Sequence, residues 1–408
     1  MKILISAAET SSDQHGAQLL RALQRECAQR GESLEAFGIG GPALQQAGLR
    51  ILVDARSLLV MGFTEVLSRL PTIFAALKTV TRSAAQEKPD VAVVIDYPDF
   101  HFRLAKRLKR QGVPVIYFIP PKIWAWRKGR IKILRERFVR VLSILPFEVD
   151  FYRREKMPVS YVGNPLVDEL PLKLTRSEAR QHLGLTEKCP VFVMMPGSRP
   201  NELKYHLDLM LGAALLASQR IQKEQGERLV ALLPLPQTSE IGLIEKRINE
   251  WKARHPDHAS TLDLRLSQGN AHECMVAADA GLIKSGTSTL EAGVLGCVHS
   301  IMYRTNKLTH FIFDHLIRYK GPVGLVNLVA GWTEGKPLLI REIIHHHQTE
   351  EELSEELLSI YQDQERRARI QEGLARVRQI VVGENEGKSP SEVAAREIIE
   401  WVRSSPAR

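Results

Sequence analysis

Two carboxylates and an imidazole directly follow the apolar run Val91–Ile95, in the segment Asp96-Tyr97-Pro98-Asp99-Phe100-His101. A carboxylate at the end of a buried strand is suited to act as a general base toward a sugar hydroxyl, provided that it points into a cleft. Asp99 is equally suited to capping a helix expected to begin near Phe102. The residues alone leave both interpretations open.

Two loops in the second half combine small residues, hydroxyl groups and a charge at the start of an expected helix. They are Pro196-Gly197-Ser198-Arg199 with Glu202, and Ser285-Gly286-Thr287-Ser288-Thr289-Leu290-Glu291. Free amides at a helix N-terminus bind phosphate oxygens, and an acid one turn later suits a ribose diol. The loops therefore favour a nucleoside diphosphate, with ordinary helix capping as the alternative. The absence of a Walker A sequence and of GxGxxG with a downstream ribose acid argues against an ATPase and a dehydrogenase.

A further polar cluster follows the first apolar run, at Glu9-Thr10-Ser11-Ser12-Asp13. Its side chains, above all Glu9, Ser11 and Asp13, either cap a helix or face a sugar or a phosphate. The glycine-rich segment Gly38–Pro42 follows the next apolar run and is a weaker sign of close ligand approach. All of these groups stand directly after expected strands, where open α/β sheets bind their ligands.

The elements that must position these groups are buried parallel strands connected by amphipathic helices, because the apolar residues alternate between short runs and helical spacing. The expected strands are 2–8, 34–39, 51–53, 91–95, 115–119, 141–145 and 160–162, then 191–195, 229–233, 262–266, 280–283 and 300–303. The expected helices are 14–29, 71–87, 102–111, 202–223, 240–254, 271–278, 288–295, 351–372 and 391–403. This alternation predicts two Rossmann-like, doubly wound α/β domains facing a cleft.

We place the domains at residues 1–167 and 168–385, with residues 386–408 as a C-terminal helix packing back on the first domain. The boundary rests on the segment Gly163–Leu174, which is rich in turn residues. The stretch Leu58–Leu77 is strongly apolar, which is typical either of a core helix or of a contact for acyl chains or a membrane. No run of about 18 apolar residues occurs, which excludes a transmembrane helix.

The 408 residues carry a formal net charge of +9, but the excess is concentrated in one half. Residues 1–165 hold 26 Lys+Arg against 15 Asp+Glu, and 13 of these basic residues lie between His101 and Arg140. This basic stretch is either a solvated helix face or a surface for an anionic membrane, a phosphorylated substrate or, least favoured, nucleic acid. No metal is expected, because the adjacent His345, His346 and His347 cannot converge on one ion and the four cysteines form no CxxC.

The chain resembles the lipid-A-disaccharide synthases, glycosyltransferases of the GT-B architecture. The motifs that carry the resemblance run along nearly the whole chain: Met61-Gly62-Phe63-Thr64-Glu65-Val66-Leu67, the loop at Asp99, Trp124-Ala125-Trp126-Arg127 with Arg130, Pro146-Phe147-Glu148, Tyr161-Val162-Gly163, the loops at Arg199 and Ser285, Tyr303-Arg304, and Asn327-Leu328-Val329-Ala330-Gly331.

The resemblance implies an inverting transfer of 2,3-diacylglucosamine from UDP to the 6-hydroxyl of 2,3-diacylglucosamine 1-phosphate, without a cofactor. It implies Asp99 as the base, and it implies a cytoplasmic protein, peripheral on the anionic inner face of the inner membrane of a Gram-negative bacterium. The donor side would comprise Gly197, Ser198, Arg199, Glu202, Ser285, Gly286, Thr287, Glu291 and Asn327. The acceptor and membrane side would comprise Glu9, Ser11, Asp13, Met61, Phe63, Trp124, Trp126, Arg127 and Arg130.

Four positions depart from the family pattern, and all lie in the acceptor half: Ser12, His101, Lys122 and Asn164. The acceptor's identity and the acyl preference therefore stay open, as does the oligomeric state, with a homodimer as one alternative. The rival functions are another GT-B UDP-sugar transferase, a UDP-sugar epimerase of the same architecture, and a basic membrane-binding protein without catalysis.

Overall fold

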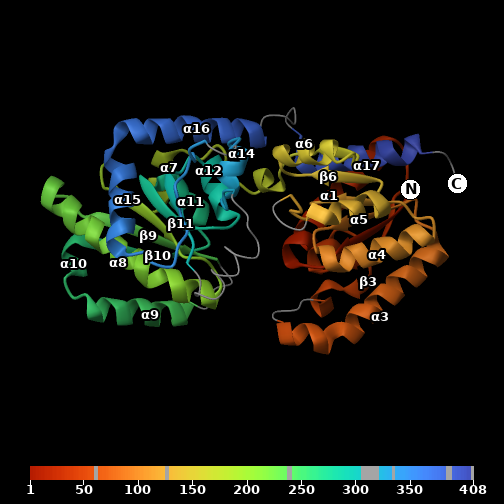
Figure 1. The fold of residues 1–408 in the computed structure, drawn as a ribbon, viewed down its shortest axis with the longest axis horizontal. Helices are drawn as coiled ribbons and strands as arrows, with labels where there is room; N and C mark the ends of the chain where they lie inside the picture. Colours follow the sequence, from red (N-terminus) through yellow and green to blue (C-terminus); the bar gives the residue numbers. More distant parts are fainter. Residues whose placement is uncertain are drawn as a thin grey trace. The chain divides into compact units, whose positions relative to one another are not determined.

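The protein was analysed as a computed structural model, which describes residues 1–58, 63–124, 128–236, 241–304, 321–332, 336–382 and 388–405. The chain forms two compact units (Figure 1). Unit 1 comprises Met1–Asp168 and Val382–Arg408, and unit 2 comprises Glu169–Val381. The last helix of the chain therefore belongs to the same unit as the N-terminal residues.

Unit 1 is built on a parallel sheet of seven strands in the order β3-β2-β1-β4-β5-β6-β7. The strands are β1 (Lys2–Ala7), β2 (Glu35–Gly40), β3 (Arg50–Asp54), β4 (Val91–Ile95), β5 (Val115–Phe118), β6 (Arg140–Ser143) and β7 (Val159–Tyr161). The central strand β4 is buried along its whole length, as expected for a parallel sheet covered on both faces.

Helices cover both faces of this sheet. The α3 (Phe63–Glu87), α4 (Pro98–Arg110) and α5 (Ile131–Arg137) helices share one apolar core with one face of the strands. The α1 (Thr10–Gln29), α2 (Pro42–Gln46) and α17 (Pro390–Ser404) helices share another core with the opposite face. Helix α17 contacts α1 (Figure 1), and α6 (Pro146–Arg154) contacts β6 and β7.

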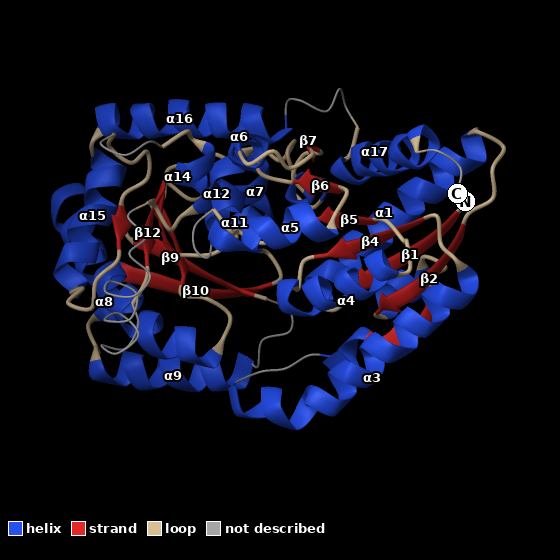
Figure 2. Ribbon diagram, turned by 45° about the vertical axis from the view of Figure 1, so that its right-hand side comes forward, coloured by secondary structure: helices blue, strands red, loops and turns tan. Residues whose placement is uncertain are grey.

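Unit 2 repeats this design with a six-stranded parallel sheet in the order β10-β9-β8-β11-β12-β13. Figure 2 draws the strands in red among the blue helices. The strands are β8 (Val191–Met195), β9 (Leu229–Leu235), β10 (Leu262–Gln268), β11 (Ala280–Lys284), β12 (His299–Met302) and β13 (Glu342–Ile343). The helices are α7 (Arg176–His182), α8 (Pro200–Gln225), α9 (Ile241–Arg254), α10 (His258–Thr261), α11 (Ala271–Ala277), α12 (Ser288–Val294), α14 (Leu325–Val329), α15 (Glu350–Gln362) and α16 (Gln364–Val382).

Both sheets reverse their winding at the centre, between β1 and β4 in unit 1 and between β8 and β11 in unit 2. Loops that leave the carboxyl ends of such neighbouring strands diverge to opposite faces and open a crevice between them. The segments singled out for chemistry follow β1, β4, β8 and β11. The winding therefore brings two of these segments together in each unit.

Several helices begin or end at residues other than those expected. The α4 helix begins at Pro98, so Asp99 lies within its first turn and does not precede a helix starting near Phe102. The α3 helix begins at Phe63 and continues through Pro71. The expected helix 351–372 is two helices, because Asp363 takes an extended conformation between them and its Oδ1 accepts a hydrogen bond from the amide of Arg366.

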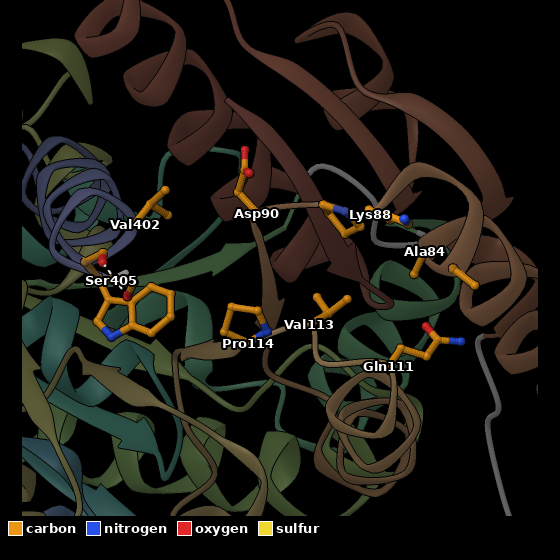
Figure 3. A pocket seen from close by; sticks show the side chains of 11 residues that line it. Ala84, Lys88, Asp90, Gln111, Val113, Pro114, Val402 and Ser405 are labelled. Atoms are coloured by element: carbon orange, nitrogen blue, oxygen red, sulfur yellow. Dashed lines mark hydrogen bonds between the residues drawn. The ribbon is translucent and has the colours of Figure 1, made fainter. Parts of the chain in front are cut away.

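A hollow of about 660 Å³ lies on unit 1 away from these loops (Figure 3). It is lined by Ala84, Lys88, Asp90, Gln111, Pro114, Trp401 and Ser405, among others. These residues flank the amino ends of β4 and β5 and the end of α17, so the hollow lies at the sheet edge opposite to Asp99. Within the described ranges, no helix is both long and apolar enough to cross a membrane.

Candidate active site

A strained backbone turn connects β4 to the helix that carries Asp99. Asp96 and Tyr97 have φ angles of 52° and 48°, in the left-handed region that residues other than glycine rarely adopt. Pro98 then takes the first helical position, where its missing N–H costs nothing. The turn reverses the chain at once, so that Asp99 stands at the carboxyl edge of the sheet with 76% of its side chain exposed.

Buried hydrogen bonds hold this turn in place. The carbonyl of Asp96 accepts from the Tyr117 hydroxyl at 2.9 Å and lies 2.5 Å from His101 Nδ1. Because a carbonyl only accepts, Nδ1 carries the proton, and Nε2 accepts from the Ser6 hydroxyl at 2.8 Å. Complete burial lowers the pKa of His101 to about 4, which keeps the ring neutral near pH 7. His101 thus ties the β4 turn to β1.

Asp99 is paired with Arg130, which follows the tryptophan-containing segment. Arg130 Nη2 donates to Asp99 Oδ1 at 2.7 Å, and the guanidinium lies over the Phe102 ring, 5.5 Å from its centroid. Among the described residues, Asp99 Oδ2 has no hydrogen-bond partner. One carboxylate oxygen is therefore oriented by the protein, and the other is available to a substrate hydroxyl.

Trp124 is anchored by a buried acid. Its Nε1 donates to Glu148 Oε1 at 2.8 Å, and its ring meets Phe147 edge to face at 4.9 Å. Glu148 Oε2 lies 2.6 Å from the Ser143 hydroxyl, and Glu148 is 1% exposed. In the described part of the connection between β5 and α5, Glu148 thus holds Trp124 and Asp99 holds Arg130.

We expect the stability of unit 1 to depend on the protonation of Glu148. Burial raises its pKa to about 7 from 4.5, although Ser143, Trp124 and the charge of Lys122 oppose this. The folded state then holds a proton that the unfolded state has released, so this group's contribution falls by about 3 kcal/mol as pH rises from 4.5 to about 7. Glu148→Gln removes this dependence.

The measurement is urea unfolding of wild type and Glu148→Gln at about pH 5 and about pH 8, with hydrogen exchange on peptides of residues 1–168. The variant should gain stability relative to wild type at the higher pH, where wild type carries a buried charge. A difference between the two proteins that does not change with pH would contradict this prediction.

In the first loop, the carboxylate of Asp13 accepts hydrogen bonds from amides of the glycine-rich segment. Its Oδ1 accepts from the amide of Gly41 at 2.6 Å and of Leu44 at 3.2 Å, and its Oδ2 accepts from Ala43 at 2.9 Å. Asp13 is 5% exposed and its carboxylate caps α2, so it holds the glycine-rich segment in place. Glu9 stands before α1, and its charge acts on Tyr97 of the neighbouring turn.

The other acceptor-side residues differ in what the structure shows of them. Ser11 is exposed in the first turn of α1. Met61, Trp126 and Arg127 lie outside the described residues, and of Phe63 only the backbone, at the start of α3, is described.

In unit 2, the loops after β8 and β11 enclose a hollow of about 330 Å³. Six of the nine expected donor residues line it: Gly197, Ser198, Arg199, Glu202, Gly286 and Thr287. Glu202 Oε2 accepts from the amides of Ser198 at 3.0 Å and Arg199 at 3.3 Å. Partial burial alone would raise the pKa of Glu202, but the hydrogen bond and charge of Lys284 and these two amides outweigh it and lower the pKa.

A buried histidine fixes the loop after β8. His206 Nδ1 lies 3.0 Å from the carbonyl of Pro196, and its Nε2 accepts from the amide of Arg304 at 2.9 Å. The carbonyl and the amide together require a neutral ring protonated on Nδ1. Burial, with a smaller contribution from Lys284, lowers the pKa of His206 and favours that state. His206 thus connects the loop after β8 to Arg304.

Three expected donor residues do not line this hollow. Glu291 pairs with His272 Nε2 at 3.3 Å, and Ser285 is buried, with its amide donating to Met302. Asn327 is fully buried, and its amide group bonds to both the N–H and the carbonyl of Ile340 and to Glu342. Asn327 therefore holds the segment before β13 in place.

Sequence reasoning missed Lys284 and His206, and it gave His101 no role of its own. Lys284 ends β11, one residue before the second loop, so its position after an apolar run was the only signal available. His101 and His206 each lie inside a helix at an apolar position, which is more typical of core packing than of a site. Each of them bonds to the carbonyl of a loop, and no side-chain motif reveals such a partner.

Comparison with known families agrees with the resemblance over nearly the whole chain. The family model described as "Lipid-A-disaccharide synthetase" matches residues 3–398. A lipid-A-disaccharide synthase of Myxococcus xanthus is 37% identical over 377 residues, which is 92% of each chain. One of Koribacter versatilis is 34% identical over 399 residues, 98% of each chain.

Solved structures support the fold. The chain is similar to MurG of Acinetobacter baumannii, with a TM-score of 0.56, 14% identity and 99% of each chain covered. It is also similar to a UDP-GlcNAc 2-epimerase of Neisseria meningitidis, with a TM-score of 0.54, 13% identity and coverage of 99% and 100%. At these identities the similarity shows the two-unit α/β fold of GT-B proteins and does not extend to activity.

Proposed function

Because the chain belongs to the lipid-A-disaccharide synthase family, we propose that it joins two acylated glucosamine units by an inverting glycosyl transfer from UDP. The donor is UDP-2,3-diacylglucosamine, the acceptor is 2,3-diacylglucosamine 1-phosphate, and the products are the β-1,6-linked disaccharide 1-phosphate and UDP. The observation that carries this proposal is the family match over residues 3–398.

In unit 1, Asp99 is the general base. The acceptor's 6-hydroxyl oxygen attacks the anomeric carbon and forms the new C–O bond, while its proton passes to Asp99 Oδ2. The bond from the anomeric carbon to the diphosphate oxygen breaks, and UDP leaves with the electron pair. Arg130 holds Oδ1 at 2.7 Å and so aims Oδ2 at the hydroxyl.

In unit 2, the hollow between the β8 and β11 loops receives the diphosphate. Arg199 is exposed at the start of α8 and supplies a planar cation for phosphate oxygens. Gly286 and Thr287 offer backbone amides and a hydroxyl on the other side of the hollow. Glu291, one turn into α12, is the candidate for the ribose diol.

The basic stretch and α3 form a surface for anionic lipid. Arg103 and Lys106 of α4 and Lys132 of α5 are exposed, and these helices cover the same sheet face as α3. Phe74 of α3 is 48% exposed. Cations attract the anionic headgroups and an exposed aromatic ring inserts among them, which suits substrates that are themselves lipids.

We expect the double variant Lys106→Glu with Lys132→Glu to bind anionic vesicles at least about tenfold more weakly, since each cation near the surface contributes about 1 kcal/mol. The measurement is co-sedimentation with phosphatidylglycerol-containing vesicles. The matched control is Lys223→Glu with Lys246→Glu on exposed positions of unit 2, which changes the net charge equally. Equal loss in both variants would mean that net charge, and not this surface, determines binding.

The activity itself is tested with purified protein, the acylated UDP donor and the acylated 1-phosphate acceptor in mixed vesicles. The proposal expects release of one UDP per disaccharide, with the β-1,6 linkage and the retained 1-phosphate established by mass spectrometry and NMR. Conversion of the UDP-sugar without any acceptor would favour an epimerase, and transfer only to water-soluble acceptors would favour another GT-B enzyme. Either result overturns the proposal.

A further inference from the structure

An ion pair crosses the point where the winding of the second sheet reverses. Lys284, the last residue of β11, donates from Nζ to Glu202 Oε1 at 2.8 Å, and Glu202 lies in the first turn of α8 after β8. Glu202 packs against Gly197, since a Cβ built there would lie 2.3 Å from Oε2, and Lys284 Nζ lies 3.9 Å from a Cβ built at Gly286. The pair thus joins the two glycine-containing loops.

Lys284 is one of the residues that line the hollow. Its side chain is 17% exposed and lines the hollow with Ser198, Arg199 and Gly286. Its ammonium group also lies 5.6 Å from the centroid of the Tyr303 ring. Glu202 divides its two oxygens between Lys284 and the amides of Ser198 and Arg199. A carboxylate therefore occupies a set of donors that equally suits phosphate oxygens.

We propose that Lys284 binds the diphosphate of the donor directly, as a second cation opposite Arg199, with Glu202 holding it in position when the donor is absent. A lysine ammonium has three donors, so Nζ can keep its bond to Glu202 and still donate to phosphate oxygens. Buried charge-assisted hydrogen bonds are stronger than neutral ones, and a cation here stabilises the charge that develops on the departing UDP.

This inference rests on the proposed function, because it assumes that the hollow binds a UDP-sugar. It adds a residue that the sequence motifs do not include. It also predicts an effect that a purely structural role would not produce. Replacing Lys284 should weaken the binding of ligands that contain a diphosphate and leave the binding of the nucleoside alone unchanged.

The experiment compares wild type with Lys284→Met and Lys284→Arg by titration with UDP and with uridine, using ligand-observed NMR for the weaker ligand. We expect Lys284→Met to bind UDP about 10- to 100-fold more weakly and uridine as wild type does, with partial recovery of UDP affinity in Lys284→Arg. Unchanged uridine affinity also establishes that the unit 2 site remains folded in the variant.

The matched control is Lys204→Met, because Lys204 also lies near a tyrosine ring, that of Tyr205, but does not line the hollow. Its UDP affinity should equal that of wild type. If wild type binds UDP and Lys284→Met binds it equally well, or loses uridine in the same proportion, the inference is overturned while the proposed function stands. If wild type binds no UDP, both are overturned.

Discussion

Asp99→Asn should reduce the transfer rate by about 10²- to 10⁴-fold while the protein stays folded and binds UDP as before. The substitution keeps the size of the side chain and an oxygen that can accept from Arg130, but it removes the group that takes the hydroxyl proton. Because Asp99 is largely exposed in unit 1, its loss leaves the core and the unit 2 hollow intact. The measurement is steady-state kinetics with both substrates, alongside UDP titration.

Asp150→Asn is the control for this variant. Asp150 is another exposed aspartate of unit 1, on α6, and the proposed reaction gives it no role, so its variant should retain wild-type kinetics. Should Asp99→Asn keep more than about a tenth of the wild-type rate at saturating substrates, the assignment of Asp99 as the base would be wrong.

Much of the fold follows from the sequence, because buried parallel strands produce short continuous apolar runs. Val91–Ile95 and Val191–Met195 are strands at the residues expected. The two-residue edge strand Glu342–Ile343 was missed, since it has no apolar run of its own and forms only by pairing with β12. Helix starts were less predictable: α4 begins at Pro98 because a strained turn, and not a capping side chain, ends the strand before it.

The site was predictable where a motif carries the chemistry and unpredictable where the partners are backbone groups. Asp99, Arg199 and Gly286 follow apolar runs in the sequence, which predicts that they lie at strand ends. The structure places them there. The same reasoning offered Asp13 as a ligand contact, yet three amides of the α2 segment, distant in the chain, occupy its carboxylate. Nothing local to Asp13 reveals these partners, since they depend on how α1 packs against α2.

The two units share an arrangement of one buried histidine that only the structure reveals. In each, a buried neutral histidine in the helix after a central strand bonds to the carbonyl of the loop that follows that strand, His101 to Asp96 and His206 to Pro196. Its other nitrogen binds a neighbouring segment, Ser6 in unit 1 and Arg304 in unit 2. A rigid ring with one donor and one acceptor can fix a reactive loop to a second element at a definite distance.

The second large effect is expected at His101, which positions Asp99 without touching a substrate. His101→Leu removes the donor to Asp96 and the acceptor for Ser6, so the left-handed residues Asp96 and Tyr97 lose part of what holds them. A displacement of about 1 Å at the base is enough to lower kcat by about 10²-fold. The donor KM should not change, because the donor loops belong to unit 2.

His101→Asn separates positioning from packing. Its amide can still donate to the carbonyl of Asp96, so this variant should recover most of the kcat lost in His101→Leu. His299→Leu is the matched control: His299 is also fully buried and bonded to a carbonyl, that of Cys297, but it lies within β12. It should lower stability and leave the kcat of the folded protein unchanged. If both leucine variants lose activity only in proportion to unfolded protein, His101 is a packing residue and Asp99 is held by Arg130 alone.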